Sequence, residues 1–162
     1  MTVYTHNHIL PVRSENIPEE LKARPQWVVW KAIGDRPDKV PYSVRSGHKA
    51  SSTDLMTWST FAEALEAYDN GEYVGLGFVF SSAGPYTGID LDNCIGEDGE
   101  IALWALEIVH YFDSYTELSA TATGLHIITR GDVPNRRKGN LEVYSSKRFF
   151  TVTGHVVEVS GD

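Results

Sequence analysis

The sequence contains a single cysteine, Cys94, among 162 residues. One cysteine excludes a disulfide within the chain and any cysteine-rich metal cluster. Long apolar runs are missing as well: no stretch of about 18 consecutive apolar residues occurs, so no transmembrane helix is predicted. The N-terminal sequence MTVYTHNHILPVRSEN lacks the basic start and apolar block of a signal peptide. We therefore expect a cytoplasmic protein with no membrane-spanning segment.

Basic residues are scarce, since 14 Lys and Arg stand against 22 Asp and Glu and the net charge is −8. This balance argues against a stand-alone, high-affinity nucleic-acid binder, because neutralising phosphates requires a basic surface. The segment 130–148 departs from the rest of the chain with only Asp132 and Glu142 as acids. Its cations are Arg130, Arg136, Arg137, Lys138, Lys147 and Arg148. This segment predicts either a locally positive end of the fold or simply a solvated hairpin.

The composition is typical of one globular domain, with 41% hydrophobic residues and no repeat, low-complexity segment or Gly/Ser-rich linker. We expect a single domain over residues 1–162, in which residues 1–16 form an extended arm. Pattern and composition predict a short helix over 17–22, a helix within 51–71 capped by Thr57 or Ser59, and an amphipathic helix over 100–112.

Short segments rich in β-branched and aromatic residues predict the strands. These segments are 27–32, 39–44, 75–80, 87–93, two strands within 116–131, and two or three within 140–159. The residues 81–85, Ser-Ser-Ala-Gly-Pro, predict a hairpin-like turn between strands 75–80 and 87–93. This order of elements indicates an α+β domain with an antiparallel sheet backed by helices.

Two acids, Asp90 and Asp92, lie two residues apart in the apolar run GIDLDNC. Residues i and i+2 of a strand share a face, so both carboxylates project together while Ile89 and Leu91 pack on the other face. Two such like charges raise one pKa strongly unless a cation lies between them, and Mg²⁺ or Mn²⁺ prefers oxygen ligands. The alternative is an Asp92-Asn93 turn at the strand end.

A third acid, Glu142, alternates with Leu141 and Val143 in NLEVYS. If its strand pairs beside 87–93, Glu142 joins Asp90 and Asp92 in a triad able to hold one or two metal ions. Two metal ions can activate a 3′-hydroxyl and stabilise the leaving pyrophosphate of an in-line displacement. The alternative is an exposed acid on an edge strand.

His126 lies in TGLHII, directly after the small residues Thr121, Thr123 and Gly124. A small-residue turn can present backbone N–H groups to a phosphate, whereas a lone histidine on a sheet can also be purely structural. Arg148 begins RFFTVTG and could hold a triphosphate through two parallel hydrogen bonds. Lys39 is a weaker candidate for the same role.

Three motifs in this order resemble the signature of the archaeo-eukaryotic primase superfamily. They read GIDLDNC, TELSATATGLHII and LEVYSSKRFFTVTG. They are most similar to the prim-pol branch, which is found in phage, plasmid and CRISPR-associated replication proteins. The segments WVVWKA, KVPY and SSTDLMTWSTFA also look like that branch, so the resemblance covers roughly residues 25–155.

The resemblance implies an RRM-like, mostly antiparallel catalytic sheet beside a smaller N-terminal α/β unit. It also implies a template-directed DNA primase-polymerase that transfers nucleotides from dNTP or NTP to a 3′-hydroxyl on single-stranded DNA. By resemblance, Asp90, Asp92 and Glu142 would hold two Mg²⁺ or Mn²⁺ ions. His126 would contact the triphosphate, with further nucleotide contacts from Ser119, Thr121, Thr123, Arg148 and Lys39.

Two departures from the prim-pol pattern matter. Many relatives have Ser-Gly where this chain has Thr121-Ala122, so the phosphate turn is expected to differ in detail. Relatives also carry a helical accessory domain or a helicase after the core, whereas this sequence stops at Ser160-Gly161-Asp162. We therefore expect an excised catalytic domain or a minimal form, with weak DNA affinity that salt abolishes steeply.

Two other functions fit the same residues. A metal-dependent nuclease or nucleotide hydrolase can also place two aspartates and a glutamate on a sheet. A non-catalytic, nucleotide-binding replication-initiator module would keep the sheet but not turnover.

Overall fold

The computed structural model describes residues 9–34 and 38–158. The first half of the expected N-terminal arm, residues 1–8, lies outside this range. Residues 9–16 follow the surface of the domain: the Leu10 amide donates to the Ala120 carbonyl at 2.8 Å and the Arg13 amide to the Thr153 carbonyl at 2.8 Å. This part of the arm is therefore hydrogen-bonded to the fold.

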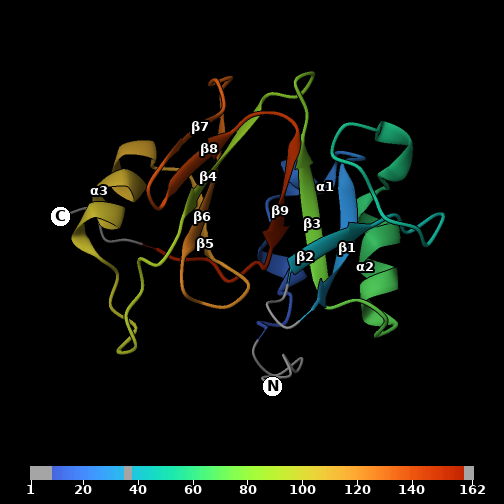
Figure 1. The fold of residues 1–162 in the computed structure, drawn as a ribbon, viewed down its shortest axis with the longest axis horizontal. Coiled ribbons are helices and arrows are strands. Elements are labelled where there is room, and N and C mark those ends of the chain that lie inside the picture. The colour runs from blue at the N-terminus through green and yellow to red at the C-terminus, as the bar shows by residue number, and fades with distance from the viewer. Residues whose placement is uncertain (1–8, 35–37, 159–162) are drawn as a thin grey trace.

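Two antiparallel sheets form the body of the domain, which confirms the α+β class (Figure 1). The four-stranded sheet has the order β2-β1-β3-β9. Its strands are β1 (Trp27–Ile33), β2 (Asp38–Tyr42), β3 (Gly75–Phe80) and β9 (Arg148–Val152). Its last strand, β9, comes from the C-terminal part of the chain, so this sheet is not built from N-terminal residues alone.

The five-stranded sheet has the order β5-β6-β4-β8-β7. Its strands are β4 (Tyr86–Leu91), β5 (Tyr115–Leu118), β6 (Leu125–Arg130), β7 (Arg136–Lys138) and β8 (Leu141–Tyr144). The edge strand β7 lies in a segment that the sequence analysis did not predict as a strand, because its three residues are all charged and exposed.

Helices cover the outer faces of both sheets. The helix α2 (Phe61–Asp69) lies outside the four-stranded sheet and α3 (Leu103–Phe112) outside the five-stranded sheet (Figure 1). The remaining helices are short: η2 (Ser14–Asn16), α1 (Glu19–Lys22) and η3 (Leu55–Thr57). No helix in the described ranges is long and apolar enough to cross a membrane.

The predicted cap of α2 was wrong by one to three residues. Thr60 caps the helix in a capping box with Glu63, in which each side chain accepts from the backbone of the other. Ser59 instead exchanges two backbone hydrogen bonds with Trp27, and Thr57 belongs to η3. Both predicted caps are therefore engaged elsewhere.

The predicted hairpin between β3 and β4 was also wrong, because these strands belong to different sheets. They lie face to face rather than edge to edge. A Cβ atom at Gly88 of β4 would lie 2.5 Å from the Phe80 ring of β3 and 2.6 Å from the Phe150 ring of β9. The absence of a side chain at Gly88 thus lets the aromatic rings of one sheet pack directly on the other.

Alternation along the five-stranded sheet separates two faces. Ile89 and Leu91 of β4, with Leu125 and Ile127 of β6, form a buried core with α3. The intervening residues face the four-stranded sheet, where an aromatic core lies between the two layers. Its aromatic members include Phe78, Phe80, Tyr86, Tyr144 and Phe150.

Candidate functional site

A row of charged residues crosses the five-stranded sheet at one register position. Glu117 of β5 is opposite His126 of β6, and His126 is opposite Asp90 of β4. On the other side Asp90 is opposite Glu142 of β8, which is opposite Arg137 of β7. Residues directly opposite on neighbouring strands share a face, so all five side chains project toward the four-stranded sheet.

Asp90 lies at the centre of this row and is largely buried, with 18% of its side chain exposed. Its Oδ1 atom is 3.5 Å from His126 Nε2 and has no hydrogen-bond partner in the described part of the chain. Burial raises the pKa of the Asp90 carboxyl, but the close approach and positive charge of His126 outweigh it, so the pKa lies below its ordinary value. Asp90 is therefore a carboxylate whose Oδ1 atom is ion-paired with His126 but accepts no hydrogen bond within the described ranges.

Asp92 follows the last residue of β4, in a turn where Asn93 has a φ of 53°. Its amide donates to the Asn140 carbonyl at 2.8 Å, which keeps the residue beside β8. Burial, followed by the nearby charges of Asp90 and Glu142, raises the pKa of Asp92 to about 6. The strand-end turn and the repulsion between like charges thus occur together at this position.

Glu142 is already engaged by two neighbours. Its Oε1 atom lies 3.0 Å from Arg137 Nε, and its Oε2 atom accepts a hydrogen bond from the Tyr144 hydroxyl at 2.8 Å. As they stand, no three His, Cys, Asp or Glu side chains in the described ranges are arranged to hold a metal ion. The two aspartates are therefore the open part of the predicted carboxylate triad.

The donor atoms at this position suit a hard divalent cation. Asp90 Oδ1, which accepts no hydrogen bond in the described part of the chain, and the adjacent Asp92 carboxylate offer oxygen ligands of the kind that Mg²⁺ and Mn²⁺ prefer. A cation there would also relieve the like-charge repulsion that raises the pKa of Asp92. The residues present thus fit the metal that the sequence analysis expects.

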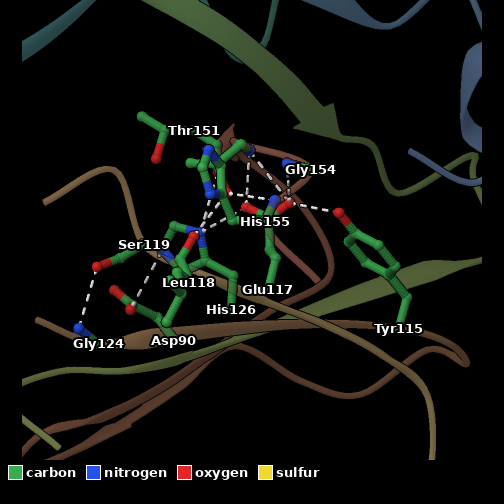
Figure 2. A network of polar contacts seen from close by, with 11 residues as sticks. Asp90, Tyr115, Glu117, Leu118, Ser119, Gly124, His126, Thr151, Gly154 and His155 are labelled. Atoms are coloured by element: carbon green, nitrogen blue, oxygen red, sulfur yellow. Dashed lines mark hydrogen bonds and ion pairs between the residues drawn. The ribbon is translucent and has the colours of Figure 1, made fainter. Parts of the chain in front are cut away.

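His126 is buried and held on several sides (Figure 2). Its Nδ1 atom lies 3.0 Å from the Thr151 carbonyl oxygen, and its ring stacks on Phe150 at 4.7 Å. Burial lowers the pKa of His126, but Asp90 on one side and Glu117 on the other raise it more, to about 9. The ring is therefore a fixed imidazolium at neutral pH.

Glu117, the fully buried acid at the end of the row, was not among the site residues predicted from the sequence. Both of its carboxylate oxygens accept from the Thr153 amide, at 3.1 and 2.9 Å, and Oε1 also accepts from Gly154 at 3.2 Å. The Tyr115 hydroxyl donates to Oε1 at 2.7 Å (Figure 2). Burial and the neighbouring Glu117 carboxylate raise the pKa of Tyr115. The sequence offered one sign of this role: Glu117 lies between Thr116 and Leu118 in a predicted strand.

A pocket of about 280 Å³ opens over the row. Among its lining residues are three cations, Lys39, Arg137 and Arg148, together with Asp90, His126 and Glu142. Asp92, two residues after Asp90, does not line this pocket. Arg148 also lies over the Tyr144 ring at 4.9 Å. The pocket therefore places the carboxylates of Asp90 and Glu142 beside three cations.

The structure does not bring Ser119, Thr121 and Thr123 into this pocket. Their hydroxyl groups bond within the turn between β5 and β6: Ser119 Oγ accepts from the Gly124 amide at 3.0 Å, and the two threonine hydroxyls are 2.9 Å apart. The Gly124 amide, which was expected to face a phosphate, is therefore already bonded. Ala122 in the same turn has a φ of 62°.

The structure thus shows an α+β domain in which the row of charged residues lies beneath a pocket lined by cations. Comparisons with known proteins can be set against this arrangement. No family model matches the chain. It is similar to a DNA primase-polymerase of Nitratiruptor phage NrS-1, with 37% identity over 146 residues. These residues are 85% of this chain and 20% of the phage protein, so the chain spans about a fifth of that relative's length. This similarity confirms the resemblance to a prim-pol domain.

Proposed function

We propose that this chain is the catalytic domain of a DNA primase-polymerase. It transfers a nucleotide from dNTP or NTP to a 3′-hydroxyl on a DNA template and releases pyrophosphate. The observation that carries the proposal is the position of Asp90, directly opposite both His126 and Glu142 and two residues before Asp92. The 37% identity to a phage DNA primase-polymerase supports it independently.

The carboxylates supply the metal ligands in this proposal. Asp90, Asp92 and Glu142 would hold Mg²⁺ or Mn²⁺. Two such ions, when bound, lower the pKa of the attacking 3′-hydroxyl and stabilise the leaving pyrophosphate. The partly buried position of Asp90 between strands keeps its carboxylate fixed, which favours accurate placement of the reacting groups.

The cations supply the triphosphate contacts. His126 offers a positive charge whose position is fixed by Thr151 and Phe150, so it loses little freedom when a phosphate binds. Arg148 can hold phosphate oxygens through two parallel hydrogen bonds, and Lys39 can add a point charge from the opposite sheet. Ser119, Thr121 and Thr123 shape the turn before β6 and so position His126 indirectly.

The nucleic-acid partners follow from the same proposal. We propose that single-stranded DNA template and a primer approach along the basic β7–β8 edge, beside the pocket. The exposed cations of this edge distinguish it from the rest of an acidic chain. A helicase or helical accessory domain in a longer protein stays a prediction from the resemblance.

A primer-extension assay tests the proposal. A labelled primer on a single-stranded template is incubated with dNTPs and Mn²⁺, and the products are separated on a gel. We expect elongation by the wild-type chain and a loss of at least about 100-fold for Asp90→Asn, because each metal contributes several kcal/mol to the transition state. Asp98→Asn, which alters an exposed acid before α3, is the matched control and should retain activity.

Other products of this assay would point to the alternative functions. A nuclease or nucleotide hydrolase would shorten the labelled strand or consume dNTP without elongation. A non-catalytic initiator module would bind dNTP and metal in titration calorimetry without releasing pyrophosphate. Either result, or full activity of Asp90→Asn, would contradict the proposed polymerase.

A further inference from the structure

Arg137 and Glu142 form an ion pair at one end of the row of charged residues. Asp90 and Glu142 lie directly opposite each other on β4 and β8. Like charges directly opposite on neighbouring strands repel, so this acidic pair needs positive charge nearby. His126 flanks the pair on the side of Asp90, and Arg137 flanks it on the side of Glu142.

The two cations differ in their freedom to move. His126 is 6% exposed, hydrogen-bonded to the Thr151 carbonyl and stacked on Phe150. The Arg137 side chain is 75% exposed and extends from the edge strand β7. Glu142 is less accessible, with 17% of its side chain exposed, but an ion pair whose cation lies in solvent is weak and can be broken at little cost. Of the two cations that flank the acids within the row, Arg137 is therefore the one that can leave.

The Arg137 side chain can also reach a second anionic partner, a phosphate bound in the pocket. It lines the same pocket as Lys39 and Arg148, the two cations assigned to the triphosphate. A guanidinium released from Glu142 needs only a side-chain rotation to face that pocket, because it already lies at the pocket wall. Its planar fork matches phosphate oxygens as well as it matches a carboxylate.

We propose that Arg137 is an exchangeable counter-ion of the metal site. In the metal-free protein it neutralises Glu142. When a divalent cation binds, Arg137 leaves Glu142, which becomes a third carboxylate ligand, and the guanidinium contacts the phosphates of the bound nucleotide. This inference rests on the proposed function, since it takes Asp90, Asp92 and Glu142 as the metal ligands.

The first test measures Mn²⁺ binding without nucleotide or DNA, from the electron paramagnetic resonance signal of free Mn²⁺. Arg137→Gln removes the competing charge, so we expect Mn²⁺ to bind about two- to fivefold more tightly than in the wild type, the range of an exposed ion pair. Arg136→Gln is the matched control: it removes the same charge one residue away, opposite Val143 on the other face of the sheet. The control should bind Mn²⁺ much as the wild type does.

The second test measures dNTP affinity by titration calorimetry in saturating Mn²⁺. Here Arg137→Gln loses a phosphate contact, and we expect binding to weaken about three- to tenfold. The two effects have opposite signs. A substitution that merely disordered the β7–β8 hairpin would weaken both Mn²⁺ and dNTP binding.

The outcomes separate the two proposals. The counter-ion role would be overturned if Arg137→Gln and Arg136→Gln bound Mn²⁺ with equal affinity. If Asp90→Asn still abolished Mn²⁺ binding in that case, the proposed function would remain intact. No Mn²⁺ binding by either the wild type or Arg137→Gln would overturn both. Weaker Mn²⁺ binding by Arg137→Gln would also overturn the exchange, since the arginine would then assist the metal site rather than compete with it.

Discussion

At the scale of single residues, the position of His126 is set by two acids that the chain places on either side of it. Glu117 and Asp90 lie on the neighbouring strands β5 and β4, directly opposite the histidine. Glu117 also accepts the amides of Thr153 and Gly154, which directly follow β9. It thereby joins the end of one sheet to the row of charges on the other. We expect Glu117 to contribute to stability as well as to the site.

Replacing Glu117 with glutamine tests this role. The shape of the side chain is kept, but the charge that faces His126 and accepts two backbone amides is lost. Since each hydrogen bond to a buried charged group contributes about 1.5–3 kcal/mol, we expect the free energy of unfolding in urea to fall by roughly 2–3 kcal/mol. Glu107→Gln on the exposed side of α3 is the control. Equal unfolding midpoints for Glu117→Gln and this control would contradict the account.

Strand alternation alone predicted that Asp90 and Asp92 project away from Ile89 and Leu91. In the structure Ile89 and Leu91 pack in the core beside α3, and Asp90 faces the other sheet. Glu117 and Arg137 could not be found this way. Their significance depends on which strands lie side by side, and such pairing is set by contacts distant in sequence.

At the scale of elements, the turn between β5 and β6 sets the start of the strand that carries His126. Ala122 in this turn takes a left-handed conformation with a φ of 62°, which favours glycine. Gly124, two residues on, allows a close approach: a Cβ atom there would lie 2.5 Å from the Leu91 carbonyl oxygen. The turn therefore connects the beginning of β6 to the end of β4, where the two aspartates lie.

Ala122→Gly should relieve the strained conformation. The left-handed penalty of about 1–2 kcal/mol exceeds the entropic cost of glycine, about 0.5–1 kcal/mol, so we expect a net gain of about 0.5–1 kcal/mol. For a domain of this size, the melting temperature measured by calorimetry would rise by about 2 °C. Ala64→Gly, within α2, should instead lower it. A melting temperature lowered by Ala122→Gly would contradict the strain argued for this turn.

Most strands could be predicted from their composition, but their assignment to sheets could not. The segments 75–80 and 87–93 read as a hairpin because a Gly-Pro turn joins them. In the structure β3 pairs with β9, about 70 residues further along the chain, and β4 pairs with β6 and β8. Packing of Phe80 and Phe150 against Gly88 outweighs the local preference for a hairpin. Similarly, the charged strand β7 has no apolar pattern by which it could be recognised.

At the scale of the whole molecule, an acidic protein presents one basic edge. Asn135 fixes this edge by accepting from the Ser145 amide at 3.0 Å and donating to the Ser146 carbonyl at 3.0 Å. These bonds hold the segment before β7 against the turn that carries Lys147. Besides Arg137, which pairs with Glu142, the edge carries the exposed cations Arg136, Lys138 and Lys147. Because the whole chain carries a net charge of −8, this edge is the place where a phosphate backbone is repelled least.

Replacing Arg136, Lys138 and Lys147 together with glutamine tests this surface. Affinity for a labelled single-stranded oligonucleotide is measured across a range of salt concentrations. Each lost phosphate contact reduces the slope of log K against log salt by about 0.7, so we expect a reduction of about 2. The control replaces Lys22, Lys31 and Lys49, which precede β3, and makes the same change in net charge. An equal loss of affinity in the control would contradict a specific surface.

If Asp90, Asp92 and Glu142 form a metal centre for nucleotidyl transfer, as we propose, a divalent cation must bind at their carboxylates. The most direct measurement is a crystal structure with Mn²⁺ and a dNTP bound, in which anomalous scattering locates the metal. We expect Mn²⁺ at about 2.1 Å from carboxylate oxygens of Asp90 and Asp92, with Arg137 displaced from Glu142 and the triphosphate beside His126 and Arg148. A bound dNTP with no Mn²⁺ at ligand distance from these three carboxylates would contradict the account.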